Sequence, residues 1–138
     1  MAKRTYDITV GGECFRLRLT LGGQRALKER FGEEALESVL TAAVDGERMA
    51  ALLTQALSWA GNSNRITDGE VFYDHLVDCG WGGQEDFGPL ACEIAAHSGL
   101  ISREQADKLK RSLLESVSQA FDALNNEEEA PQRPTQRP

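Results

Sequence analysis

The sequence predicts an α+β fold that is mostly α, with an N-terminal β-hairpin followed by about five or six helices and a disordered C-terminal tail. Apolar and polar residues alternate with a period of two on either side of Gly11 and Gly12, which is the pattern of a hairpin. Further along the chain, apolar residues recur every three or four positions, and glycines interrupt this helical period at intervals. The 138 residues suit one domain, which we place at residues 1–125, with the tail at residues 126–138.

The register of the predicted hairpin follows from its turn. If Gly11 and Gly12 form a two-residue turn, the apolar residues of both strands lie on one face. The expected cross-strand pairs are Val10 with Glu13, Ile8 with Phe15, Tyr6 with Leu17 and Asp7 with Arg16. The alternation continues to Leu21, so we expect the second strand to end at Gly22 and Gly23. An isolated hairpin is marginally stable, and the helices must therefore cover its apolar face.

Three segments after the hairpin have the helical period, and a glycine follows each of them. The expected helices span residues 24–31, 36–43 and 49–60, and the glycines that end them are Gly32, Gly46 and Gly61. The break between the second and third helices is the dipeptide Asp45-Gly46.

Two capping boxes indicate where later helices begin. Thr67 and Glu70 form the first box, which opens a helix over residues 67–79 that stops at a glycine. Ser102 and Gln105 form the second box, which opens the longest helix. The apolar stripe of that last helix consists of Ala106, Leu109, Leu113, Val117, Phe121 and Leu124.

Between these helices, Pro89 is expected in the first turn of another helix, which ends at Gly99. After Asn125 the chain is rich in charged residues and proline and has no large apolar residue. Residues 126–138 are therefore predicted to be a disordered tail.

The charge of the chain, −7 overall, is unevenly distributed. Residues 1–30 hold seven Lys and Arg against three Asp and Glu, whereas residues 31–126 hold six against sixteen. An acidic body repels phosphate backbones, so nucleic acid is not an expected partner. No apolar run approaches the ~20 residues of a membrane span, and the N-terminus lacks the pattern of a secretory signal. We therefore expect a cytoplasmic protein without a membrane partner.

A search for catalytic and metal-binding patterns predicts no enzyme. His75, Cys79, Cys92 and His97 would be the ligands of a zinc site, but they lack the tight pairing of structural zinc sites. The three cysteines, of which Cys14 is the third, are instead expected to be buried free thiols.

Other polar motifs have similarly ordinary explanations. Asp74 and Asp78 lie one helical turn apart, which is common on a solvated helix face. The glycine pairs at residues 22–23 and 82–83 lack the Lys-Ser/Thr that follows a phosphate-binding loop. We expect no catalytic residue, no metal site and no cofactor.

Five apolar residues are candidates for partner binding, because they lie at helix ends or in the glycine-rich loop. They are Trp59, Trp81, Phe87, Leu100 and Ile101. A large apolar group at such a place either covers the core or anchors a partner protein. The last helix presents the same alternative, since its apolar stripe can pack within the domain or complete a groove for an amphipathic helix.

The beginning of the chain resembles the tail assembly chaperones of long-tailed bacteriophages and related gene transfer agents. The resemblance covers a strand, a Gly-Gly-Glu turn, the Leu-rich segment from Phe15 to Gly22 and a short helix that ends in Arg30-Phe31-Gly32. The layout of the helices is also similar over residues 5–125, by pattern more than by identity. The chain departs from the pattern at residues 26–29, Ala-Leu-Lys-Glu, where similar proteins often have a Leu-Glu pair.

The resemblance implies a protein without catalytic residues that binds the tape measure protein, keeps it soluble and helps the tail tube to assemble. Such a protein acts in the cytoplasm of the bacterial host and is absent from the mature virion. The tail tube protein is a second expected partner, and the sequence leaves open both a homo-oligomer and a longer, frameshifted form. The alternatives are a minor component retained in the tail and a general acidic adaptor that binds other proteins.

Overall fold

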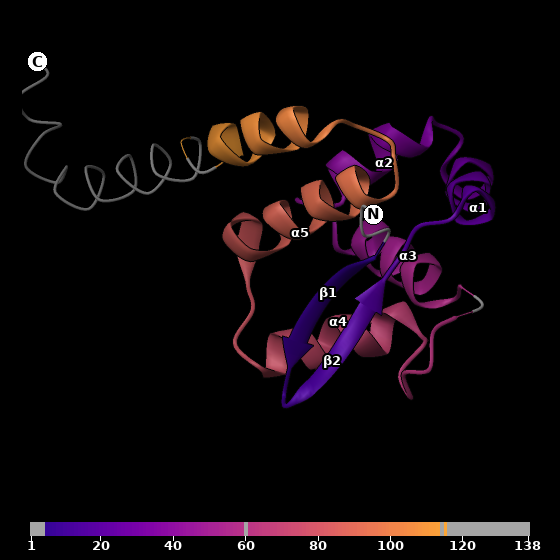
Figure 1. The fold of residues 1–138 in the computed structure, drawn as a ribbon, viewed down its shortest axis with the longest axis vertical. Helices are drawn as coiled ribbons and strands as arrows, with labels where there is room; N and C mark the ends of the chain where they lie inside the picture. The colour runs from indigo at the N-terminus through magenta and orange to yellow at the C-terminus, as the bar shows by residue number, and fades with distance from the viewer. Residues whose placement is uncertain (1–4, 60, 114, 116–138) are drawn as a thin grey trace, which may run out of the picture.

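The computed structural model describes residues 5–59, 61–113 and 115 (Figure 1). Its elements are β1 (Tyr6–Val10), β2 (Glu13–Leu17), α1 (Leu21–Phe31), α2 (Ala35–Thr41), α3 (Gly46–Leu57), α4 (Gly69–Asp78) and α5 (Gly83–His97). A further helix, called the terminal helix below, covers residues 103–113. The predicted class, an N-terminal hairpin followed by helices, is confirmed. The predicted tail and the distal apolar positions Val117, Phe121 and Leu124 lie outside the described residues.

The hairpin has the predicted register. Its pairs include Tyr6 with Leu17, Asp7 with Arg16, Ile8 with Phe15 and Val10 with Glu13. Gly11 and Gly12 have φ angles of 58° and 84°, and positive values at both central residues define the turn type that matches the strand twist. The expectation from the alternating pattern is therefore confirmed.

The end of the second strand differs from the prediction. β2 stops at Leu17, and α1 already begins at Leu21, because the Thr20 hydroxyl accepts a hydrogen bond from Gly23 N at 3.1 Å. Leu21 is 69% exposed and does not continue the buried face of the strand. The prediction that Gly22 and Gly23 end the strand is wrong, since both lie in the first turn of α1.

Aspartates begin α3 and α4. The Asp45 carboxylate accepts hydrogen bonds from Glu47 N and Arg48 N, which confirms the helix break at this position. The Asp68 carboxylate accepts hydrogen bonds from Glu70 N and Val71 N at the start of α4. The predicted cap at Thr67 is therefore wrong by one residue. α3 ends at Leu57, earlier than its predicted end at residue 60.

The predicted start of α5 is wrong, whereas the predicted start of the terminal helix is confirmed. α5 begins at Gly83, where Gly82 N donates to the Asp86 carboxylate at 2.8 Å, so Pro89 lies inside the helix and not in its first turn. At the next helix, Ser102 N donates to Gln105 Oε1 and Gln105 N donates to Ser102 Oγ, which is the predicted capping box.

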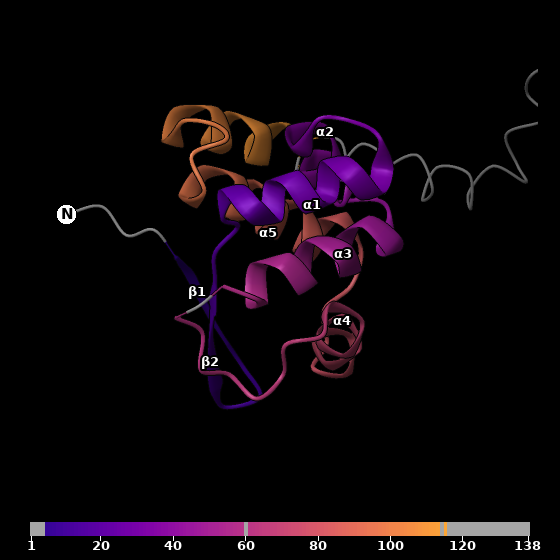
Figure 2. The same cartoon turned by 90° about the vertical axis from the view of Figure 1, so that its right-hand side faces the viewer.

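The hairpin lies beside the helices, as Figures 1 and 2 show, and its buried residues pack against them. The Phe15 ring of β2 lies 4.6 Å from the Phe72 ring of α4, and both are fully buried. At the other end of the hairpin, the Tyr6 ring lies 5.4 Å from the His97 ring of α5. The helices thereby bury the apolar surface that an isolated hairpin would expose. None of the described helices has the length and apolarity needed to cross a membrane.

α3 and α4 approach each other closely at Gly69. A Cβ atom at this position would lie 1.8 Å from Ala50 O and 2.5 Å from Thr54 N, so no side chain fits there. Gly69 N, one of the free amides at the start of α4, donates to Thr54 Oγ1 at 2.7 Å. This contact fixes the start of α4 against the middle of α3.

The terminal helix is attached to the domain by a buried ion cluster. Glu93 of α5, which is 7% exposed, accepts two hydrogen bonds from the Arg103 guanidinium, at 2.7 and 2.9 Å, and another from Lys110. The hydrogen bonds from Arg103, together with Lys110, lower the pKa of Glu93 to about 2 despite the burial of its carboxyl group. Burial and the charge of Glu93 raise the pKa of Tyr6.

Substitution of Gly69 tests the close approach. Gly69→Ala should destabilise the protein by about 3 kcal/mol or more, because the methyl group meets backbone atoms that cannot move separately. Gly22→Ala is the control, since the nearest atom to its Cβ would be 3.8 Å away and alanine favours a helix by up to about 1 kcal/mol. Chemical denaturation measures both, and equal stabilities of the two variants would contradict the packing described.

Substitution of Glu93 tests the ion cluster. The folded pKa of Glu93 lies below its ordinary value of 4.5, so its ionised form stabilises the fold above that pH, and this contribution is lost as the pH falls toward 2. Glu93→Gln should therefore cost about 2–3 kcal/mol at pH 7 and clearly less at pH 3, measured by urea denaturation.

The control for this measurement is Asp107→Asn. Asp107 also contacts Arg103, at 3.1 Å, but its side chain is 47% exposed, and the expected loss is below about 1 kcal/mol. If Glu93→Gln destabilised the protein equally at both pH values, the cluster would not stabilise the fold through its charge.

Candidate partner-binding groove

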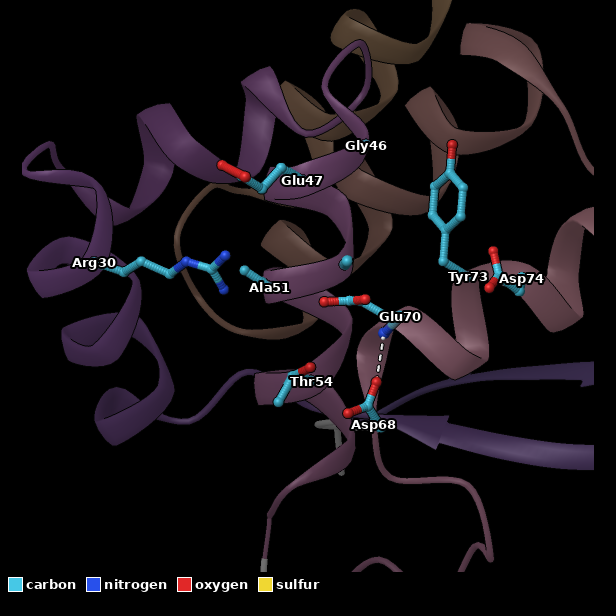
Figure 3. A pocket seen from close by; sticks show the side chains of 10 residues that line it. Arg30, Gly46, Glu47, Ala51, Thr54, Asp68, Glu70, Tyr73 and Asp74 are labelled. Atoms are coloured by element: carbon cyan, nitrogen blue, oxygen red, sulfur yellow. Dashed lines mark hydrogen bonds between the residues drawn. The ribbon is translucent and has the colours of Figure 1, made fainter.

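A groove of about 540 Å³ lies between α3 and α4 and reaches the end of α1 (Figure 3). Its lining consists of Arg30, Gly46, Glu47, Ala50, Ala51, Thr54, Asp68, Glu70, Tyr73 and Asp74. The volume lies within the ~300–1,000 Å³ of typical ligand sites. The lining combines small apolar side chains with charged ones, which suits a ligand that carries both kinds of group.

The walls of the groove come from helices whose positions are fixed by the Gly69 contact. Asp68, which caps α4, also lines the groove, and Figure 3 shows its hydrogen bond to the amide of Glu70. In the same view Arg30 and Glu70 extend toward the middle of the groove from opposite sides. At the far end, the Tyr73 hydroxyl lies 3.6 Å from the position of a Cβ atom at Gly46, so the first turn of α3 borders this ring.

A second hollow of about 300 Å³ adjoins the groove, because Gly46 and Tyr73 line both. It is bordered by the turn between α2 and α3 and by the start of α5. The Tyr73 ring stacks on the Phe87 ring at a centroid distance of 4.9 Å and an angle of 8°. Val44, in the turn, is 63% exposed beside this hollow. The two depressions together form a continuous surface feature from Arg30 to α5.

Residues next in sequence to the groove lining form a network around Arg48. The guanidinium donates to the Glu33 carboxylate at 2.9 and 3.1 Å and to the Asp45 carboxylate at 2.6 Å. It also lies 4.6 Å from the centre of the Phe31 ring. These hydrogen bonds from Arg48 are the main reason that the pKa values of Glu33 and Asp45 lie below their usual range. Arg48 thus connects the end of α1 to the start of α3.

The structure separates the five predicted partner-binding residues. Trp81 and Phe87 meet near the start of α5, at a centroid distance of 5.9 Å, and Phe87 is only 4% exposed. Leu100 and Ile101 follow the other end of α5, where they are partly buried against the core. Of the five, Phe87 alone borders the depressions described above.

Trp59, the fifth of these residues, lies beside the outer edge of β2. Its indole N–H donates to Arg16 O at 3.1 Å, and the Arg18 guanidinium lies 5.8 Å from its ring centre. The side-chain amide of Asn64, in the same loop, donates a hydrogen bond to Cys14 O and accepts one from Arg16 N. These side chains occupy the hydrogen-bonding groups of the strand edge, which gives Trp59 a structural role in the loop after α3.

The cysteines differ from the prediction that all three are buried. Cys14 and Cys79 are exposed, and only Cys92 is buried, where burial raises its pKa. Cys14 lies on the outer face of β2, and Cys79 lies just beyond α4, so neither faces the core. Within the described ranges, no three His, Cys, Asp or Glu side chains come together in a group that could hold a metal ion.

Sequence reasoning did not identify the groove. Asp74 was expected on a solvated helix face, which it is, but the groove beside it depends on how α4 lies against α3. The sequence signal for it is Gly69, between the polar residues Asp68 and Glu70. Glycine is unfavourable within a helix, so its presence there indicates a close approach to another part of the chain.

In comparisons with known proteins, the chain matches no protein-family profile, no curated protein and no solved structure.

Proposed function

We propose that this protein is a tail assembly chaperone of a bacteriophage or prophage, which binds the tape measure protein in the bacterial cytoplasm and keeps it soluble. The groove between α3 and α4 is the observation that supports this proposal best. A long helical protein with apolar stripes aggregates when the stripes are exposed, and a groove walled by two helices can cover such a stripe.

The lining of the groove favours reversible binding. Ala50 and Ala51 offer small apolar contacts, while Glu47, Glu70 and Asp74 keep the margins polar and exposed. An interface of this mixed composition is typical of partners that associate and separate, whereas permanent interfaces are more apolar. Release is required of a tail chaperone, because tail tube subunits must replace it around the tape measure. The tail tube protein is a second proposed partner.

The net charge of −7 also suits this role. A complex that carries excess negative charge repels other copies of itself, which limits aggregation while the tail is incomplete. An acidic cover protein can thereby keep a poorly soluble partner dispersed.

Co-expression tests the proposed function. The tape measure protein that the proposal requires in the same genome should be more soluble when co-expressed with this chain, and the two should co-purify. Ala50→Trp should reduce both effects, because the indole occupies the groove that the partner needs. Val77→Trp is the matched control, since Val77 is an exposed residue of α4 outside the groove lining and should leave both effects unchanged.

Two results would contradict the proposal. One is a tape measure protein whose solubility does not change in the presence of this chain. The other is detection of this chain in purified particles at the level of a structural subunit by mass spectrometry, which would favour the alternative of a retained tail component.

A further inference from the structure

We propose that the groove between α3 and α4 binds a basic amphipathic helix, whose Lys and Arg side chains pair with the carboxylates of the groove and whose apolar side chains cover its floor. This inference rests on the proposed function in one respect, because the helix is taken to belong to the tape measure protein. The observations that define the chemistry of the helix belong to the groove itself.

The first observation is an excess of negative charge in the segment that includes α4, one wall of the groove. No Lys or Arg occurs between Arg65 and Arg103, a segment that includes α4 and α5 and carries the carboxylates Asp68, Glu70, Asp74, Asp78, Glu85, Asp86 and Glu93. Glu93 is neutralised by Arg103 and Lys110. In the described part of the chain, the other six carboxylates form no ion pair, as the ion pairs observed involve other residues.

The second observation is the placement of these charges along the groove. Glu70 and Asp74 are four residues apart on α4, so they follow one wall at intervals of one helical turn, about 5.4 Å. Glu47 on α3 stands on the opposite wall. Cations one turn apart on a partner helix have the same spacing and can pair with the carboxylates of α4.

The third observation is the apolar floor between the charged margins. Ala50 and the largely buried Ala51 present only methyl groups, and Tyr73 contributes a half-buried ring. Small side chains allow a neighbouring helix to approach closely, and the ring offers a flat surface to a leucine or methionine. An apolar face bordered by cations therefore fits this groove along its length.

The arrangement of the carboxylates favours organic cations on a polypeptide over a bound metal ion. A metal site requires several ligands around one point, and the described residues contain no such group of three. The four carboxylates that line the groove instead extend along it, from Glu47 to Asp74. Among the residues that the structure describes, Arg30 is the only cation in the lining, and it makes the α1 end of the groove less favourable for a partner cation.

Peptide binding to the full-length protein tests the inference. The probes are two labelled helical peptides with the same leucine face, one with Lys and one with Glu at the polar positions, and fluorescence anisotropy measures their affinities. The Lys peptide should bind at least tenfold more tightly than the Glu peptide, and the difference should decrease with added salt. Glu70→Lys with Asp74→Lys should weaken binding of the Lys peptide at least tenfold.

The control variant has the same change of net charge at a distance from the groove. Glu104 and Glu115 are exposed on and after the terminal helix and line neither depression, so Glu104→Lys with Glu115→Lys should change the affinity less than threefold. Glu70→Gln with Asp74→Asn, checked by circular dichroism, provides a milder change that removes charge without reversing it. This neutral variant should also lose affinity for the Lys peptide.

The outcomes separate this inference from the proposed function. Equal binding of both peptides, or equal losses in the groove variant and its control, would overturn the basic-helix inference, while co-purification with the tape measure would still support the chaperone. If the Lys peptide binds selectively and the tape measure does not co-purify, the groove has the inferred specificity and the proposed function is wrong.

Discussion

The contact between α4 and α3 at Gly69 determines the shape of the functional surface. Because position 69 has no side chain, the start of α4 can lie against Ala50 O and Thr54 N. Thr54 Oγ1 accepts a hydrogen bond from Gly69 N, an amide that has no partner within α4. The same contact orients the rest of α4. Its buried face then meets the hairpin through Phe72, while Glu70 and Tyr73 form a wall of the groove.

α4 consequently contributes residues both to the core and to the groove. Three consecutive residues show this. Phe72 is fully buried in the core, whereas Tyr73, half-buried beside Gly46, and the exposed Asp74 line the groove. The Phe15 ring of the hairpin supports Phe72 from the opposite side. A groove built on a packed helix keeps its shape when empty, which lowers the entropic cost of binding a partner.

Local sequence patterns predicted the parts of the fold that depend on neighbouring residues. The hairpin register followed from the glycine turn and the alternation, and the box at Ser102 and Gln105 followed from a four-residue motif. Local patterns failed where two signals competed. Leu21 continues the strand alternation, but the Thr20 hydroxyl caps α1 at this point of the chain. Thr67 and Asp68 are both suitable caps for α4, and Asp68 is the residue that caps it. The groove itself depends on how α4 packs against α3, and Gly69 is the sequence signal of that close approach.

The terminal helix is attached to the domain by ion pairs as well as by apolar contacts, and this has a mechanical consequence. Among its described residues, Ala106 is fully buried and Leu113 lies against Gly88 of α5, while Arg103 and Lys110 pair with Glu93. A pulling force applied from the C-terminal side would therefore act on these ion pairs before it reached the aromatic contact of Phe15 and Phe72. The point of attachment would therefore yield before the hairpin separates from α4.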